Sequence, residues 1–161
     1  MVGAICSVVP DADVIGFRLG VGYGDFWGHR GFTHSVLFAA GLAFLAAGFV
    51  VAMSSANING RMLWLYFFVA TASHGLLDAL TDGGLGVAFF SPFDTDRYFF
   101  PWRPVPVSPI SIARFFTERG WAVLKSEIVW IWIPAGILAI LAVSLRRWMA
   151  GEETTSRTRQ L

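Results

Sequence analysis

The chain has 161 residues, which is enough for one domain. Hydrophobic residues make up 55% of it and charged residues 14%, and its mean hydropathy is +0.60, so it is more apolar than an ordinary soluble domain. The net charge of +1 gives no sign of a basic surface, so nucleic acid is not expected as a partner. The single cysteine, Cys6, excludes an intrachain disulfide and a cysteine-based zinc motif.

The first residues form an apolar segment that is too short to cross a membrane. Residues 1–10 reach only about 15 Å as a helix. They lack the basic start and the cleavage site of a signal peptide. We interpret them as a partial N-terminal helix, which either begins upstream of this sequence or enters the membrane only halfway. Residues 10–28 are polar and rich in glycine, which predicts a connection rather than a regular element.

Three runs without charged side chains follow, over residues 36–53, 62–77 and 128–145. Each approaches the roughly 20 residues that cross the hydrocarbon layer as a helix. A soluble all-α core is the alternative, but its helices should show a polar face, and these runs show almost none. We therefore predict an all-α membrane helix bundle with about three spanning helices, over about 33–53, 62–80 and 126–145.

Details of the first two predicted spans indicate how they pack. Ala39, Ala43 and Ala47 recur four residues apart, and small residues at that spacing let helices approach closely in lipid. The short polar turn over residues 54–61 makes the two spans antiparallel neighbours. Thr33 is predicted to cap the first span, which places His34 in its first turn.

The region between the second and third predicted spans is a long amphipathic loop, over residues 81–127. Its prolines exclude a long helix through residue 109, and its many aromatic side chains suit the headgroup region. A short interfacial helix is expected over about 108–119. We predict a single membrane-embedded domain over residues 1–150 and a polar, disordered tail over 151–161. Basic residues divide almost evenly between the two sides of the membrane, so they favour neither orientation.

An ionisable pair stands out in the second predicted span. His74 and Asp78 lie four residues apart and so share one face of a helix. Ionisable groups inside a span are costly to bury and usually serve a function. The alternative is a hydrogen bond between the two that only fixes helix packing.

The other two histidines, His29 and His34, flank Gly31. With His29 in a turn and His34 at the start of a helix, both side chains can face one point. Asp11 and Asp13 precede them and supply carboxylates. Imidazole and carboxylate suit zinc, manganese or iron. The pattern predicts one metal ion or two at the edge of the bundle, and three unrelated surface histidines are the alternative.

Residues 10–13, 29–35 and 73–81 read Pro-Asp-Ala-Asp, His-Arg-Gly-Phe-Thr-His-Ser and Ser-His-Gly-Leu-Leu-Asp-Ala-Leu-Thr. They resemble the motifs of the YdjM-type membrane-bound metal-dependent hydrolases of the bacterial inner membrane, and the resemblance covers about residues 5–105. It implies a multi-pass helical protein and a distant likeness to zinc-dependent phospholipase C. Family members usually carry a further histidine near their start, which this sequence does not contain. The metal ligands that the resemblance implies are Asp11, Asp13, His29, His34, His74 and Asp78.

These observations predict a metal-dependent hydrolase that cleaves an ester or phosphoester, with a lipid-linked substrate suggested by the membrane edge. His29, His34, His74 and Asp78 are the preferred ligands. Asp11 or Asp13 would complete the coordination or act as the general base. Zinc is the expected metal, with manganese or iron as alternatives.

Two arginines complete the predicted site. Arg30 and Arg97 are expected to hold an anionic group of the substrate, because guanidinium binds phosphate in a bidentate manner. A lipid headgroup or a salt-bridge partner is the alternative for both. Two rival functions remain for the whole protein: a proton- or ion-relay transporter, and a non-catalytic membrane scaffold stabilised by a metal.

Overall fold

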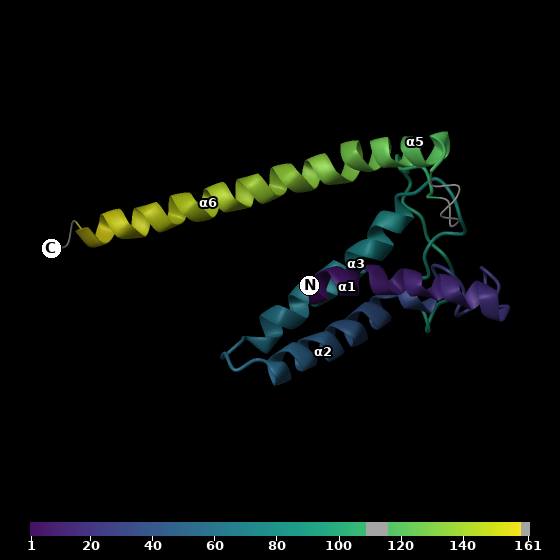
Figure 1. Cartoon of the computed structure of the whole chain (residues 1–161), viewed down its shortest axis with the longest axis horizontal. Coiled ribbons are helices and arrows are strands. Elements are labelled where there is room, and N and C mark those ends of the chain that lie inside the picture. The colour runs from purple at the N-terminus through teal and green to yellow at the C-terminus, as the bar shows by residue number, and fades with distance from the viewer. Residues whose placement is uncertain (109–115, 159–161) are drawn as a thin grey trace. The chain divides into compact units, whose positions relative to one another are not determined.

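The computed structural model describes residues 1–108 and 116–158, with side chains through Met149. The chain forms two compact units, Met1–Ile110 and Ser111–Leu161, and we describe each by itself (Figure 1). All regular elements of the described residues are helical, and two isolated bridges join Thr81 to Val105 and Val87 to Tyr98. The predicted all-α class is thus confirmed. The predicted division into one domain over residues 1–150 and a tail over residues 151–161 stays a prediction.

The first unit is built on three helices that pack along one another. α2 (Val36–Met53) and α3 (Gly60–Ala79) are antiparallel neighbours, as their short connection predicts, and α1 (Val2–Val8) packs against α3 (Figure 1). α1 is the expected short N-terminal helix. It runs directly into a 3-10 helix, η1 (Val9–Leu19), where glycine-rich sequence predicts only a connection.

Small side chains hold α2 and α3 together. Ala39, Ala43 and Ala47 are buried, and Ala43 is completely so. The spacing of these alanines therefore identified the packing face correctly. Cys6 of α1 and Phe67 of α3 fill the rest of this core, so the lone cysteine has a packing role.

Enlarging this contact is expected to destabilise the unit. Ala43→Leu forces three extra carbon atoms into a site with no exposed surface, which costs about 1–3 kcal/mol. Thermal unfolding in detergent measures the effect as a lower Tm. Gly48→Leu is the matched control, because a Cβ at Gly48 of the same helix meets no atom within 4 Å. An equal loss in both variants would contradict close packing at Ala43.

The N-terminus of α2 differs from the prediction. Ser35, not Thr33, caps the helix, because its side-chain oxygen accepts a hydrogen bond from the backbone N–H of Phe38 at 3.0 Å. The hydroxyl of Thr33 instead donates to the Asp13 carboxylate at 2.7 Å. His34 consequently lies in a separate 3-10 turn, η2 (Phe32–His34), just before α2 and not in its first turn.

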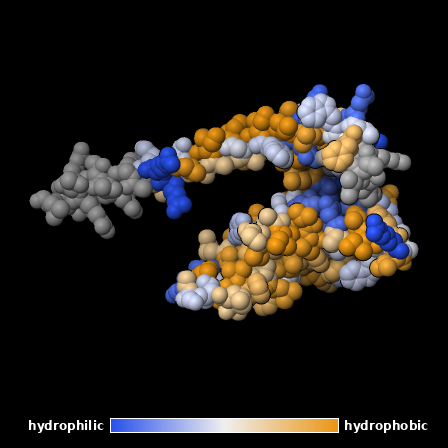
Figure 2. Space-filling view, viewed as in Figure 1, coloured by the Kyte–Doolittle hydropathy of each residue, from blue (hydrophilic) through white to orange (hydrophobic). Residues whose placement is uncertain are grey.

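Two helices in the described part of the chain are long and apolar enough to cross a membrane, fewer than the three predicted. They are α2 and the continuous helix over Glu118–Met149. α3 has sufficient length, but Arg61, His74 and Asp78 and its small polar residues lower its hydropathy. Hydrophobic residues nevertheless cover much of the visible surface of the helical part of this unit (Figure 2).

Residues 118–158 of the second unit form one long helix with a local irregularity. α5 (Glu118–Glu127) continues through a π-helical turn, η3 (Ile128–Trp132), into α6 (Ile133–Thr158). Pro134 lies two residues after the end of the π turn and cannot donate the regular backbone hydrogen bond, which accounts for the altered spacing. The helix includes residues 151–158, where a disordered tail is predicted, since glutamate and arginine there are compatible with helix. Most of the predicted interfacial helix, residues 109–115, lies outside the described residues.

Candidate metal centre

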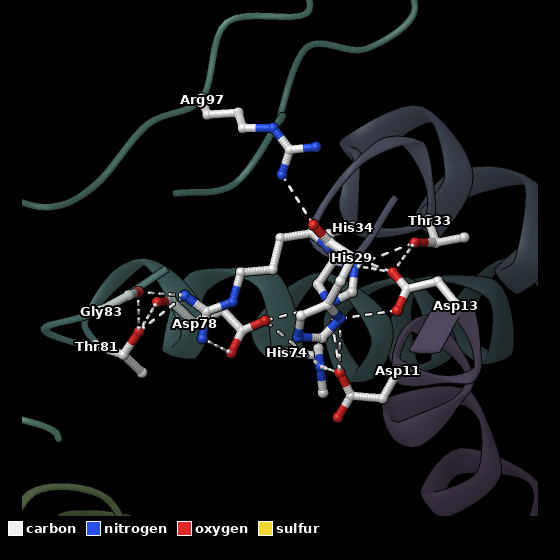
Figure 3. Close-up of polar contacts among 11 residues, drawn as sticks. Asp11, Asp13, His29, Thr33, His34, His74, Asp78, Thr81, Gly83 and Arg97 are labelled. Carbon is white, nitrogen blue, oxygen red and sulfur yellow. Dashed lines mark hydrogen bonds and ion pairs between the residues drawn. The ribbon is translucent and has the colours of Figure 1, made fainter. Parts of the chain in front are cut away.

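Four segments of the first unit bring the predicted ligands together (Figure 3). They are η1, the turn that precedes η2, the last residue of η2, and the C-terminal half of α3. The residues that they carry are, in that order, Asp11 and Asp13, His29, His34, and His74 and Asp78. All six predicted ligands therefore lie at one end of the helical unit.

Two glycines allow this convergence. A Cβ on Gly31 would lie 2.4 Å from the carbonyl oxygen of Phe26, so only glycine fits the turn between His29 and His34. A Cβ on Gly75 would lie 3.0 Å from the carbonyl oxygen of His34. The backbone of η2 can therefore approach α3 closely, and His34 reaches His74, with 5.1 Å between ring centroids.

Four donor atoms form the first group. Nε2 of His34 lies 3.2 Å from Oδ2 of Asp78 and 3.6 Å from Oδ1 of Asp11. Nε2 of His74 lies 3.2 Å from the same oxygen of Asp11 and 3.8 Å from that of Asp78. Two ligands bound at about 2.1 Å in a tetrahedral arrangement are separated by roughly 3.4 Å. The four separations lie around this value.

Three of these four donor atoms have no hydrogen-bond partner. Nε2 of His34, Nε2 of His74 and Oδ2 of Asp78 are buried and make no hydrogen bond. Buried polar atoms without partners are rare and costly in folded proteins. A divalent cation between them would satisfy all three, so the residues fit a metal ion.

Asp13 organises a second group together with His29 and His34. Its Oδ1 lies 2.8 Å from Nδ1 of His29, and its Oδ2 lies 3.3 Å from Nδ1 of His34. The same Oδ2 accepts hydrogen bonds from the hydroxyl of Thr33 and the backbone N–H of Arg30. Asp13 thus approaches His34 from the side opposite the first group. Carboxylates placed in this way orient a histidine and make it a stronger ligand.

The carboxylates and histidines shift one another's protonation. Burial lowers the pKa of His34, but the carboxylates of Asp11, Asp13 and Asp78 outweigh burial and raise it to about 10. Burial raises the pKa of Asp11 and of Asp13, but contacts with the histidines outweigh it and hold both well below the usual range. This concentration of negative charge favours a cation at the position that the histidines face.

The two predicted substrate-binding arginines make contacts within the protein, and Figure 3 labels Arg97. Arg30 is buried, and its guanidinium donates to Oδ1 of Asp78 at 2.9 Å, to the hydroxyl of Thr81 and to the carbonyl oxygen of Gly83. Arg97 donates to the carbonyl oxygen of His29 at 2.9 Å and to two more in the preceding turn. These contacts support positioning roles, and the substrate-binding role stays a prediction for both.

Sequence reasoning missed the partners that orient the ligands. Thr33 is predicted only as a helix cap, whereas its hydroxyl donates to Asp13, and the hydroxyl of Thr81 accepts from Arg30, the partner of Asp78. The signal that could have identified Thr33 is its place between two histidines. The pairing of Arg30 with Asp78, 48 residues apart, has no local signal.

The Asp13→Asn variant tests whether Asp13 only orients the histidines or is itself a metal ligand. We expect the variant to bind metal with 10–100-fold lower affinity, a loss of about that size being usual for such partners, and still to saturate at the wild-type stoichiometry. Competition titration against a chromogenic zinc chelator measures both quantities. Asp11→Asn should lose more, because Asp11 contributes an atom to the first group. A larger loss of metal affinity in Asp13→Asn than in Asp11→Asn would instead make Asp13 the ligand and Asp11 the orienting residue.

Imidazole and carboxylate donors gathered beside the start of a long apolar helix define a membrane protein with a candidate metal centre. The chain belongs to the YdjM inner membrane protein family, which it matches over residues 1–150, as the sequence motifs predict. It is similar to the inner membrane protein YbcI of Escherichia coli (strain K12), with 40% identity over 143 residues that cover 84% of this chain and 78% of that protein. No solved structure matches it. The predicted location in the inner membrane is confirmed.

Proposed function

We propose that this protein is a membrane-bound metal-dependent hydrolase that cleaves an ester or a phosphoester. The observation that carries the proposal is the convergence of Nε2 of His34, Nε2 of His74, Oδ1 of Asp11 and Oδ2 of Asp78, three of which are buried without a hydrogen-bond partner. Ionisable groups in such an arrangement are expensive for a membrane protein to maintain, which favours a functional role.

The donor set indicates which metal would bind. Two imidazoles and two carboxylates suit zinc, and manganese or iron are the alternatives. When bound, such a metal polarises the scissile group and lowers the pKa of water. The side chain of His34 is completely buried, whereas that of Asp11 is 46% exposed. Substrate therefore has access from the Asp11 side.

This difference in exposure suggests a division of roles. His34, His74 and Asp78 would hold the metal, and Asp13 would fix the ring of His34. Asp11 would either complete the coordination or accept a proton from the attacking water, since a general base must lie within hydrogen-bond reach of it. Burial raises the pKa of Asp11, but contacts with His34 and His74 outweigh it and keep the carboxylate ionised, which favours the ligand role, because an efficient general base has a pKa nearer the working pH.

A metal-stabilised scaffold without catalysis is the second candidate. The observation that favours it is the number of donors, because four protein ligands can fill a tetrahedral sphere and leave no place for water. Such a site would raise stability by metal binding without any turnover.

One experiment compares the two candidates. Purified protein is stripped of metal, reloaded with zinc, manganese or iron, and assayed on bis(p-nitrophenyl) phosphate and p-nitrophenyl acetate. We expect turnover with one metal, its loss on chelation, and its absence in His74→Ala. Asp94→Asn serves as the control, because Asp94 lies outside both donor groups. Stoichiometric metal without turnover of either compound would favour the scaffold.

A further inference from the structure

Two segments that contact the start of α2, near the candidate metal centre, carry exposed aromatic side chains. Trp27 is 57% exposed and Phe93 is 88% exposed, and Phe26 and Phe90 are also exposed. Neither of the two segments that carry them, 26–28 and 89–93, contains a charged residue. Single exposed apolar residues are ordinary on any protein, but a group of aromatic residues at one place indicates an interaction surface. We call Phe26, Trp27, Phe90 and Phe93 the aromatic rim.

Both segments of the rim are attached to the first turn of α2. The carbonyl oxygen of Phe89 accepts a hydrogen bond from the backbone N–H of Val36, the first residue of α2, at 2.9 Å. On the other side, Phe32 stacks on Phe26 and packs against Trp27, and it also contacts Phe38 of α2, with ring centroids 5.2, 5.3 and 5.9 Å apart. The rim is therefore held in a fixed position relative to the helix.

The position of the rim follows from that of the helix. α2 can cross the membrane, and Val36 and Leu37 in its first turn are exposed, so the apolar surface of the span continues into the rim. Aromatic side chains at the end of a span favour the boundary between hydrocarbon and headgroups. His34 precedes α2 by two residues, which corresponds to a distance on the order of 5 Å. The candidate metal centre would then lie at the depth of the headgroups.

We propose that the aromatic rim inserts into the lipid bilayer and holds the metal centre at headgroup depth, so that the substrate is an amphiphile whose ester or phosphoester group the bilayer presents. The substrate part of this inference rests on the proposed hydrolase function, whereas the position of the rim does not. Continuity of the rim with the surface of a membrane span favours lipid over a protein partner as its occupant.

The depth of the rim can be measured without any activity. The full-length protein is reconstituted in vesicles of phosphatidylethanolamine and phosphatidylglycerol that carry bromine either near the headgroup or near the chain end. The difference in fluorescence between wild type and Trp27→Phe isolates Trp27, which we expect headgroup-proximal bromine to quench. Trp64→Phe is the control, because the indole of Trp64 donates to the carbonyl oxygen of Ala40 within the helix pair and should respond to deeper bromine. Quenching of Trp27 by aqueous iodide and by neither brominated lipid would overturn the proposal.

The substrate class needs a second measurement. Turnover of phosphatidylglycerol in the same vesicles is compared with turnover of water-soluble bis(p-nitrophenyl) phosphate. For Phe93→Ser we expect the ratio of lipid to soluble turnover to fall about tenfold, since removing an aromatic side chain that inserts into the bilayer forfeits that order of apolar transfer energy. An unchanged ratio, or turnover of the soluble compound alone, would refute the lipid substrate and leave the hydrolase intact. If neither compound is hydrolysed with any metal, the proposed function itself fails, and the quenching result still decides the position of the rim.

Discussion

His34→Ala is expected to leave the purified protein without stoichiometric divalent metal. His34 is the one residue that belongs to both donor groups, with Nε2 toward Asp11 and Asp78 and Nδ1 toward Asp13. Its loss also leaves three carboxylates around an empty space, and their repulsion opposes the geometry that the remaining ligands need. Loss of an orienting partner alone reduces metal affinity 10–100-fold, so loss of His34 should cost more than about 100-fold.

Elemental analysis after dialysis against dilute zinc gives the metal content per chain. Asp94→Asn is the control, because it also removes one ionisable group from the loops of the unit but lies outside both donor groups. Circular dichroism establishes that each variant is folded. A folded His34→Ala protein that retains one zinc per chain would show that His34 is not a ligand.

The helices were predictable from sequence because their causes are local. Alanines four residues apart marked the packing face of α2, and uncharged runs marked the long helices. The cap of α2 was not predictable, because Thr33 and Ser35 are both suitable caps and a contact with Asp13, 20 residues away, occupies Thr33. The predicted count of about three spans is somewhat higher than the two helices that are apolar enough to span, because α3 carries the ionisable residues of the site, which reduce its hydropathy.

The site was predictable as a set of residues but not as a set of roles. Motif spacing and family resemblance named all six histidines and aspartates that the structure brings together. Spacing could not distinguish Asp11, which faces Nε2 of both His34 and His74, from Asp13, which faces Nδ1 of His29 and His34. That distinction depends on which edge of each ring points inward, and tertiary packing decides it.

Arg30→Ala is expected to destabilise the protein by about 3–5 kcal/mol, the usual cost of breaking a buried ion pair by removing one partner. Only 4% of the Arg30 side chain is exposed, and it neutralises Asp78, whose other oxygen belongs to the metal group. The guanidinium also ties the end of α3 to the following loop through Thr81 and Gly83. The backbone at Arg30 has φ +63, which is strained for any residue with a Cβ, so a change to alanine or lysine leaves that strain in place and reports on the side chain.

Comparison of single and double variants assigns this loss to the ion pair. Unfolding is measured in detergent with chelator present, so that metal affinity does not contribute. Asp78→Asn in the Arg30→Ala background should recover part of the stability, because it removes a carboxylate charge that has lost its arginine partner and keeps only its contacts with the histidines. Arg30→Lys should fall between wild type and Arg30→Ala, since lysine restores the charge but not the fork that reaches Asp78 and Thr81 together. Two results would show that Arg30 does not hold Asp78 in place: an Arg30→Ala protein as stable as wild type, or strictly additive losses of unfolding free energy in the double variant. The guanidinium of Arg30 would then be available for the anionic group of a substrate.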